Sequence, residues 1–413
     1  MTKNININAD RLWHSLMEMA KVGATENGGN CRLALSDLDK EARDLFVEWC
    51  EDAGCSISVD AIGNIFARRP GKNNTLPSVM AGSHLDTQPT GGRFDGVLGV
   101  LSVLEIIRTL NDRNIETSIP IDAVCWTNEE GSRFAPSMMG SGVHAGVFDL
   151  DSIKASTDID GNLLGQELRR IGYAGTQVPG EQKARAYFEL HIEQGPILEE
   201  SKKTIGVVTG AQGQQWLEIH VTGTESHAGP TPMPRRRDAL VGASKIIQEV
   251  NRIGLNFAPN ACTTVGMIKA YPNSRNVIPG YVFLTVDLRH PKNGTLSKMT
   301  SNLKTFCSRL ATSDKLKIEI TDLVNFPAVS FNSSCIATIR EGAKLLGLPY
   351  KSIVSGAGHD AVYMARVTPS GMIFIPCKDG ISHNEVESAS YDDCASGCNV
   401  LLHAILQLAE SPH

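Results

Sequence analysis

The stretch SVMAGSHLDTQPTGGRFDGVLGVLSVLEIIRTL, residues 78–110, combines a short apolar run, a glycine-rich loop and a segment that is apolar nearly all round. Residues 78–83 predict a buried strand, and residues 97–110 predict a helix enclosed by other elements. A second apolar, β-branched run follows at residues 121–126. Strands that alternate with helices predict an α/β fold, with a mixed sheet between layers of helices.

Strand-like and helix-like segments also occur on both sides of this stretch. Residues 36–54 begin at Ser36, a good N-cap residue, and end at Gly54, which predicts an amphipathic helix. The other elements expected here are strands at 62–67 and 372–376 and helices at 334–346 and 391–409. We therefore expect a large α/β domain formed by residues 1–210 and 326–413.

A second unit begins after the glycine-bearing stretch at residues 206–213. Its expected elements are, in order, a strand (215–222), a helix (238–252), two strands (262–269 and 281–288), a helix (295–311) and a strand (315–321). This β-α-β-β-α-β order is typical of a split βαβ sandwich. The sequence thus predicts a smaller domain of residues 211–325 inserted into the larger one.

The composition narrows the class of protein. A chain of 413 residues is too long for one ordinary core, and its 41% hydrophobic and 20% charged residues are typical of folded domains. A net charge of -6 argues against binding of nucleic acid or an anionic membrane. The start of the chain, MTKNININADRLWHSL, lacks the features of a secretory signal, and no apolar run approaches the roughly 20 residues of a membrane span. We expect a cytoplasmic protein whose partner is a small molecule.

The string GSHLDT, residues 82–87, ends an expected strand with His84 and Asp86 two positions apart. A carboxylate behind a histidine is a common way to fix the tautomer of a metal ligand. Eleven residues after His84, GGRFDG places Asp95 just before the buried helix. The alternative for His84 is a bond to a main-chain carbonyl, and the alternative for Asp95 is capping of the helix.

The string NEEG, residues 128–131, places Glu129 and Glu130 directly after the expected strand at 121–126. Two adjacent carboxylates near a buried strand repel each other unless a cation or a proton separates them. One could bind a metal ion while the other takes a proton from water, which is the division of roles that hydrolysis requires. An exposed acidic turn is the alternative.

Two further histidines follow expected strands, His191 in HIEQG and His383 in GISHNE. Open α/β sheets bind their ligands at the carboxyl ends of the strands, so the five candidates meet at one edge of the sheet. Three histidines, an aspartate and a glutamate suit two divalent ions that share one carboxylate. Nitrogen and oxygen ligands of this kind accept Zn, Mn, Co or Ni, so the sequence leaves the metal open.

Other polar residues have the character of substrate ligands. His227 lies in the glycine- and proline-rich string SHAGPTPM, and Asn276 and Arg289 flank the expected strand at 281–288. Arg289 could bind a carboxylate through two parallel hydrogen bonds, although a surface ion pair is the alternative. Gly358 and His359 belong to SGAGHD, a turn that could present backbone N–H groups to a polar substrate or serve only as a tight loop.

Eight strings occur in order along nearly the whole chain: GSHLDT, GGRFDG, NEEGSRF, HIEQGP, SHAGPTPM, RNVIPG, SGAGHD and GISHNE. Their combination resembles the amidase, hydantoinase and carbamoylase branch of the two-metal amidohydrolases, which is related to aminoacylases and carboxypeptidase-like enzymes. The peptidase-like relatives tend to have an acidic ligand where this sequence has His191.

The resemblance implies a role for each site residue. The implied metal ligands are His84 and His191 on one ion, Glu130 and His383 on the other, and Asp95 between the two. Asp86 would stand behind His84, and Glu129 would be the general base. The implied substrate ligands are Gln194, His227, Asn276 and Arg289, with Arg289 binding the substrate carboxylate. The inserted domain would act as a lid and form a homodimer, in which His227 reaches the partner's site and stabilises the oxyanion.

The expected reaction is hydrolysis of a carbamoyl (ureido) C–N bond, in which Glu129 takes the proton of the attacking water and returns it to the leaving amine. Within the branch the substrate could be an N-carbamoyl-L-amino acid, N-carbamoyl-β-alanine, or allantoate or ureidoglycolate. Two rivals stay open, namely a peptidase or deacylase with the same metals and a binding protein on an inactive fold.

Overall fold

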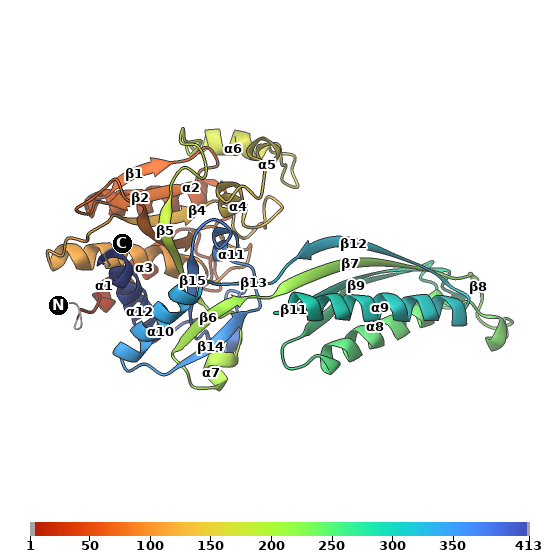
Figure 1. Ribbon diagram of the computed structural model, residues 1–413. Coiled ribbons are helices and arrows are strands. Elements are labelled where there is room, and N and C mark those ends of the chain that lie inside the picture. The colour runs from red at the N-terminus through yellow and green to blue at the C-terminus, as the bar shows by residue number, and fades with distance from the viewer. Residues whose placement is uncertain (1–4, 411–413) are drawn as a thin grey trace. The chain divides into compact units, whose positions relative to one another are not determined.

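The computed structural model describes residues 5–410, in which the chain forms two compact units (Figure 1). Unit 1 contains the residues up to Gly210 and those from Ser330 onward, and unit 2 contains Ala211–Val329. Each unit has its own hydrophobic core. No helix within residues 5–410 is long and apolar enough to cross a membrane.

Unit 1 is built on a mixed sheet. Its strands are β1 (Ser56–Val59), β2 (Ile65–Arg69), β3 (Ser78–His84), β4 (Ile121–Trp126), β5 (Ala184–Ile192), β6 (Ile205–Ala211), β13 (Val329–Ser330), β14 (Tyr350–Ser355) and β15 (Ser370–Ile375). The order is β1-β2-β4-β3-β5-β15-β6-β13, with β14 paired to β6. The central strands β4, β3, β5 and β15 are parallel, and β2 and β6 join them antiparallel. The predicted α/β class with a mixed sheet is confirmed.

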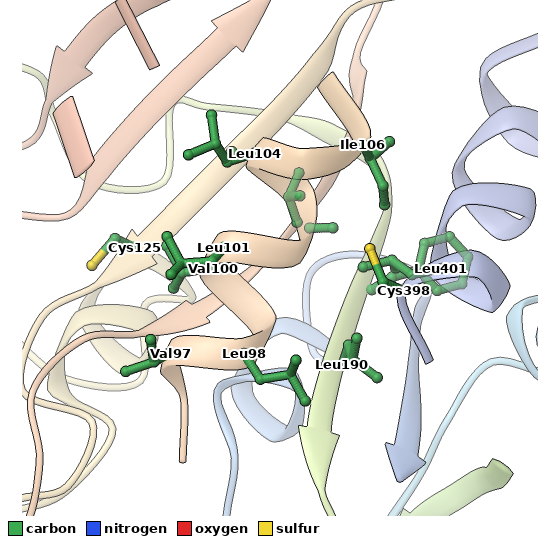
Figure 2. Packing of buried hydrophobic residues seen from close by; sticks show 14 of the residues in the cluster. Val97, Leu98, Val100, Leu101, Leu104, Ile106, Cys125, Leu190, Cys398 and Leu401 are labelled. Carbon is green, nitrogen blue, oxygen red and sulfur yellow. The ribbon is translucent and has the colours of Figure 1, made fainter. Parts of the chain in front are cut away.

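Helices cover both faces of this sheet. The longer ones are α1 (Ala9–Met19), α2 (Asp37–Asp52), α3 (Val97–Asp112), α10 (Ser333–Leu345) and α12 (Tyr391–Glu410), and the shorter ones are α4 (Met139–His144), α5 (Leu150–Lys154), α6 (Leu164–Arg170), α7 (Ile197–Glu200) and α11 (Asp360–Met364). On one face α3 and α12 pack beside each other on the sheet, where Cys125 and Leu190 of the sheet and Cys398 and Leu401 of α12 belong to one hydrophobic cluster (Figure 2). On the other face Trp126 of β4 contacts His144 of α4.

Hydrogen bonds to local side chains explain where α2 and β2 begin. The side chain of Ser36 caps α2 by accepting the N–H of Asp39, as the sequence predicts. The strand expected at 62–67 begins instead at Ile65. The carboxylate of Asp60 accepts the N–H groups of Ile62 and Asn64, which holds residues 60–64 in a turn.

Unit 2 has the element order that the sequence predicts. The strands are β7 (Gly213–Thr222), β8 (Ser226–His227), β9 (Cys262–Tyr271), β10 (Val277–Ile278), β11 (Tyr281–His290) and β12 (Lys317–Phe326), and the long helices are α8 (Ala239–Asn256) and α9 (Asn293–Ser313). Four strands form an antiparallel sheet in the order β12-β7-β11-β9, against which α8 and α9 pack. The strands β8 and β10 form a separate short ribbon beyond the end of this sheet.

His144 gives unit 1 a testable sensitivity to acid. Burial lowers the pKa of His144 from its usual 6.5 to about 4, and its Nδ1 accepts the N–H of Gly180. The unfolded chain therefore binds a proton below about pH 6.5 that the folded chain refuses, so stability is complete above that pH and falls as the pH approaches 4. The cost at pH 5 is about 2 kcal/mol.

We expect His144→Gln to remove this term, because glutamine can still accept a hydrogen bond but does not titrate. Urea denaturation at about pH 7 and about pH 5 measures it. The loss of stability between the two pH values should be smaller in the variant than in the wild type by the stated amount. An equal loss in both proteins would show that His144 is not the source.

Candidate metal centre

The carboxyl ends of the parallel strands in unit 1 carry the first histidines of the site. His84 is the last residue of β3 and lies beside Trp126 of β4 in register, and His191 is next to last in β5. Asp95 lies in the loop before α3, and the Glu129–Glu130 pair follows β4. The parallel topology thus brings together residues from four separate segments, at the edge where such sheets bind ligands.

The first ligand group consists of His84, Asp95 and His191. Asp95 Oδ1 lies 3.0 Å from His191 Nε2 and 3.6 Å from His84 Nε2. Two ligand atoms at about 2.1 Å from a tetrahedral ion are roughly 3.4 Å apart. All three side chains are buried, and the residues of this group fit one divalent ion.

The second ligand group consists of Asp95, Glu130 and His383. His383 Nε2 lies 3.5 Å from Asp95 Oδ2 and 3.3 Å from Glu130 Oε2. Gln88 donates a hydrogen bond of 2.7 Å to the same Glu130 oxygen. Asp95 belongs to both groups and contributes a different oxygen to each, which is the arrangement that a shared carboxylate requires.

Glu129 is a further carboxylate beside the first group and belongs to neither. Its Oε2 lies 3.5 Å from His84 Nε2, and the residue is 8% exposed. Burial raises the pKa of Glu129 well above 4.5, against the lowering effect of His84. The position suits a group that holds or moves a proton next to a ligand rather than one that binds the ion.

The charges around Asp95 are consistent with bound cations. Burial and the neighbouring Asp95 raise the pKa of Glu130 to about 8. The pKa of Asp95 lies well below 3.8, because His191 and His84 outweigh its burial. Asp95 and Glu130 each place an oxygen within 3.5 Å of His383 Nε2. Neighbouring buried carboxylates repel each other, and a divalent ion among them relieves that repulsion.

Asp86 lies behind His84, but its carboxylate does not fix the ring. His84 Nδ1 is 2.9 Å from the main-chain carbonyl of Asp86 and 3.9 Å from the nearer carboxylate oxygen. The carboxylate instead accepts the N–H groups of Glu129 and Glu130, both at 3.2 Å. The Asp86 carbonyl, rather than its carboxylate, therefore makes the shorter contact with the His84 ring, and Asp86 itself lies beyond the end of β3.

Three residues around the ligands have the left-handed backbone conformation. Asn128, Gln194 and His383 have φ values of 53°, 58° and 53°. Gln194 Nε2 donates a hydrogen bond of 2.8 Å to Asp95 Oδ2 and lies 3.4 Å from His383 Nε2. Gln194 therefore contacts both the shared aspartate and a ligand of the second group.

His359 is buried beside the ligands. Its ring centroid is 4.6 Å from that of His191, and its Nε2 is 3.0 Å from Ser355 Oγ. It could form a third ligand group with Glu189 and His191. The oxygens of Glu189 already accept hydrogen bonds from Ser83 and Ala361, which argues against an ion there. Gly358 is adjacent to His359, and a Cβ atom at this position would lie 3.0 Å from the end of the Met138 side chain, so that a larger residue would require Met138 to shift.

The other three predicted substrate ligands lie in unit 2, where His227 and Asn276 are neighbours and Arg289 lies apart from both. His227 is in the β8 ribbon, and Asn276 immediately precedes β10, with both side chains exposed. Arg289 is near the far end of β11, eight residues beyond Tyr281, or about 27 Å along the strand. Its guanidinium pairs with Asp287 at 2.8 Å.

Three residues that contact the ligand groups are not among the predicted site residues, namely Gln88, Ser382 and Glu387. Gln88 directly follows GSHLDT, Ser382 belongs to GISHNE, and Glu387 lies two residues after that string. Polar residues this close to predicted ligands were a usable signal, although their partners depend on how the loops meet.

Comparison with known proteins places the chain in a family. A sequence model of Peptidase family M20/M25/M40 matches residues 80–407. The chain belongs to this family. An N-carbamoyl-L-amino-acid amidohydrolase from Rhizobium meliloti is 48% identical over 99% of this chain and 98% of its own length. A ureidoglycolate hydrolase from Arabidopsis thaliana is 32% identical, over 99% and 88%. As an M20 member, the chain is a C–N bond hydrolase that uses divalent metal ions.

Solved structures support the same placement. An amidase of the hydantoinase/carbamoylase family from Burkholderia multivorans has a TM-score of 0.96 and 57% identity, and covers 99% of this chain and 100% of its own. The resemblance to this branch is thereby confirmed. The aminopeptidase PepT from Bacillus cereus, with a TM-score of 0.71 and 17% identity over 98% and 100%, shares the fold.

Proposed function

We propose that this M20 enzyme hydrolyses the carbamoyl C–N bond of N-carbamoyl amino acids to the amino acid, CO2 and NH3. The observation that carries the proposal is the buried Glu129 carboxylate next to two ligand groups that share Asp95. Relatives named N-carbamoyl-L-amino-acid amidohydrolase, including one at 48% identity, support the choice of bond.

Five residues would hold two divalent ions, with His84 and His191 on one, Glu130 and His383 on the other, and Asp95 shared. Ions bound there would polarise the carbamoyl oxygen and lower the pKa of water toward about 7. The Asp86 carboxylate would hold the main chain of the Glu129–Glu130 pair, and the Asp86 carbonyl would orient His84.

Glu129 would move the proton. Its carboxylate takes a proton from the attacking water, whose oxygen forms a bond to the carbamoyl carbon. When the C–N bond to the amino acid breaks, Glu129 returns the proton to the leaving amine, and the carbamate then decays to CO2 and NH3. The burial of Glu129 supports this role, because a carboxylate shielded from solvent accepts a proton readily.

Recognition of the substrate would involve unit 2 and a second copy of the chain. Arg289 would bind the substrate carboxylate, and Gln194, Gly358 and His359 would line the reacting end. His227 and Asn276 lie beyond the Tyr281 end of β11, and Arg289 lies about 27 Å along the strand from Tyr281, so the three residues cannot contact one small substrate within a single unit 2. A homodimer formed through unit 2 would supply His227 to the partner's site.

The decisive experiment compares substrates. The purified protein is assayed with N-carbamoyl-L-amino acids, N-carbamoyl-β-alanine, allantoate, ureidoglycolate, N-acetyl amino acids and dipeptides, each with Zn²⁺, Mn²⁺, Co²⁺ or Ni²⁺. Release of ammonia from the carbamoyl amino acids with the highest kcat/KM is the expected result. Faster turnover of allantoate or ureidoglycolate would favour the second candidate function, which the ureidoglycolate hydrolase relatives support. Cleavage of peptides or N-acyl amino acids alone would contradict the proposal.

The dimer is tested by mixing two inactive variants. His227→Ala would lack the group that reaches the partner's site, and Glu129→Gln would lack the proton carrier. A mixed dimer contains one site with both groups intact, so mixing should restore part of the activity. Mixed dimers that form, as shown by differently tagged subunits, but stay inactive would contradict a shared site.

Arg289 gives a second test of recognition. Replacing it by glutamine removes a charge-assisted pair with the substrate carboxylate, worth about 1.5–3 kcal/mol, and should raise KM roughly 10- to 150-fold with a smaller change in kcat. Arg309→Gln, which changes an exposed arginine on α9 of the same unit, is the matched control. An unchanged KM in Arg289→Gln would remove this residue from the substrate site.

A further inference from the structure

A buried carboxylate outside both ligand groups holds the loop that carries Asp95. Glu387 is 1% exposed and lies four residues after His383. Its Oε1 accepts the main-chain N–H groups of Phe94 and Asp95, both at 3.1 Å. Glu387 and the Phe94–Asp95 segment are nearly 300 residues apart in the chain. The Glu387 carboxylate therefore joins two loops that are distant in sequence.

Ser382 completes a closed ring of contacts. Its Oγ lies 2.8 Å from Glu387 Oε2 and 2.8 Å from Asp95 Oδ2. Glu387 therefore contacts the backbone of Asp95 directly and its side chain through Ser382. With both ends of the residue held, the Asp95 carboxylate loses its freedom to rotate about its side-chain bonds.

The space that the Glu387 side chain occupies depends on a glycine at position 92. A Cβ atom on Gly92 would lie 2.1 Å from the Glu387 carboxylate, so residue 92 must be glycine for Glu387 to occupy its position. Gly92 belongs to the string GGRFDG, which also contains Asp95. The Asp95 loop and the His383 loop are thus fitted to each other at this point.

The orientation of Asp95 matters because its two oxygens face different ligand groups. Oδ1 faces His84 and His191, and Oδ2 faces His383. A small rotation of the carboxylate would move both oxygens away from their partners at once. Ser382 also directly precedes His383, so the same contacts fix the backbone of a second ligand.

We propose that Ser382 and Glu387 are positioning residues that set the Asp95 carboxylate between the two ligand groups and so determine the affinity of the divalent-ion centre. The inference rests on the proposed function of those groups as ligands. It predicts a larger effect on the Asp95, Glu130 and His383 group, because Ser382 contacts Asp95 Oδ2 and adjoins His383.

The test is titration of metal-free protein with Zn²⁺ or Mn²⁺ by calorimetry, with Co²⁺ absorption to report ligand geometry. Ser382→Ala and Glu387→Leu should bind the weaker ion 10- to 100-fold less tightly than the wild type, about the usual effect of removing a group that supports a ligand. Ser382→Thr keeps the hydroxyl and should restore binding, and Glu387→Gln keeps an acceptor for the two N–H groups and should bind better than Glu387→Leu.

Glu385→Leu is the matched control, because this neighbouring carboxylate bonds to Asn27 and should leave metal binding unchanged. Ser382→Ala removes one partly exposed oxygen and keeps the test open if Glu387→Leu does not fold. Wild-type metal affinity and Co²⁺ spectra in Ser382→Ala would overturn the inference and leave the proposed function standing, even if thermal stability fell. A wild-type protein that bound no divalent ion would overturn both.

Discussion

Replacement of Glu129 by glutamine is expected to reduce kcat by about 10³-fold, within the 10²- to 10⁴-fold range of general acid–base groups. Glutamine has nearly the same shape but cannot accept the proton of the attacking water or deliver one to the leaving amine. Glu129 lies 3.5 Å from His84 and outside both ligand groups, so the amide should leave the ions in place.

Steady-state kinetics with an N-carbamoyl-L-amino acid, together with metal analysis of the same samples, make this measurement. The change should fall on kcat, with KM and metal content close to wild type. Glu181→Gln, which removes an exposed carboxylate from unit 1, controls for loss of charge alone. Wild-type turnover in metal-loaded Glu129→Gln would exclude Glu129 as the proton carrier.

Replacement of Asp95 by asparagine is expected to affect both ligand groups at once. An asparagine offers one carbonyl oxygen, whereas the two oxygens of Asp95 face His191 at 3.0 Å and His383 at 3.5 Å. The variant should lose at least one of the two ions, and with it several kcal/mol of transition-state stabilisation, or about 10³-fold in kcat/KM.

Thermal unfolding with and without metal gives a measurement of Asp95→Asn that does not depend on turnover. An ion present at 100 times its Kd stabilises a folded protein by about 2.7 kcal/mol, so added Zn²⁺ or Mn²⁺ should raise the Tm of the wild type. The rise should be smaller in Asp95→Asn and unchanged in Asp392→Asn, an exposed aspartate of α12. An equal rise in all three proteins would mean that Asp95 is not a shared ligand.

The fold could be predicted from sequence where local signals determine it. The N-cap at Ser36 fixed the start of α2, and the apolar run at Ile121–Trp126 gave β4 its exact bounds. The order of elements in unit 2 followed from alternating periodicities. β2 begins three residues after its predicted start. The turn before it is held by hydrogen bonds to the Asp60 side chain, and a pattern of hydrophobic residues does not reveal such bonds.

The sequence could predict those residues of the candidate metal site that the sheet topology alone brings together. Parallel strands bring their carboxyl ends together, so the residues at or just after the ends of β3, β4 and β5 had to be neighbours. The contacts between loops could not be predicted, because the bonds from Glu387 to Phe94 and Asp95 depend on how distant segments meet. The separation of Arg289 from His227 likewise follows from pairing within the unit 2 sheet.

The left-handed backbone at Asn128, Gln194 and His383 has a consequence for stability. At Gln194 and His383 this conformation costs roughly 1–2 kcal/mol relative to a glycine, whereas asparagine at position 128 adopts it readily. Glycine at position 194 or 383 would make the folded backbone less strained but would remove the groups that contact Asp95. Selection for heat resistance and selection for turnover therefore favour different residues at positions 194 and 383, and a thermostabilised variant should keep Gln194 and His383 unchanged if it is to remain active.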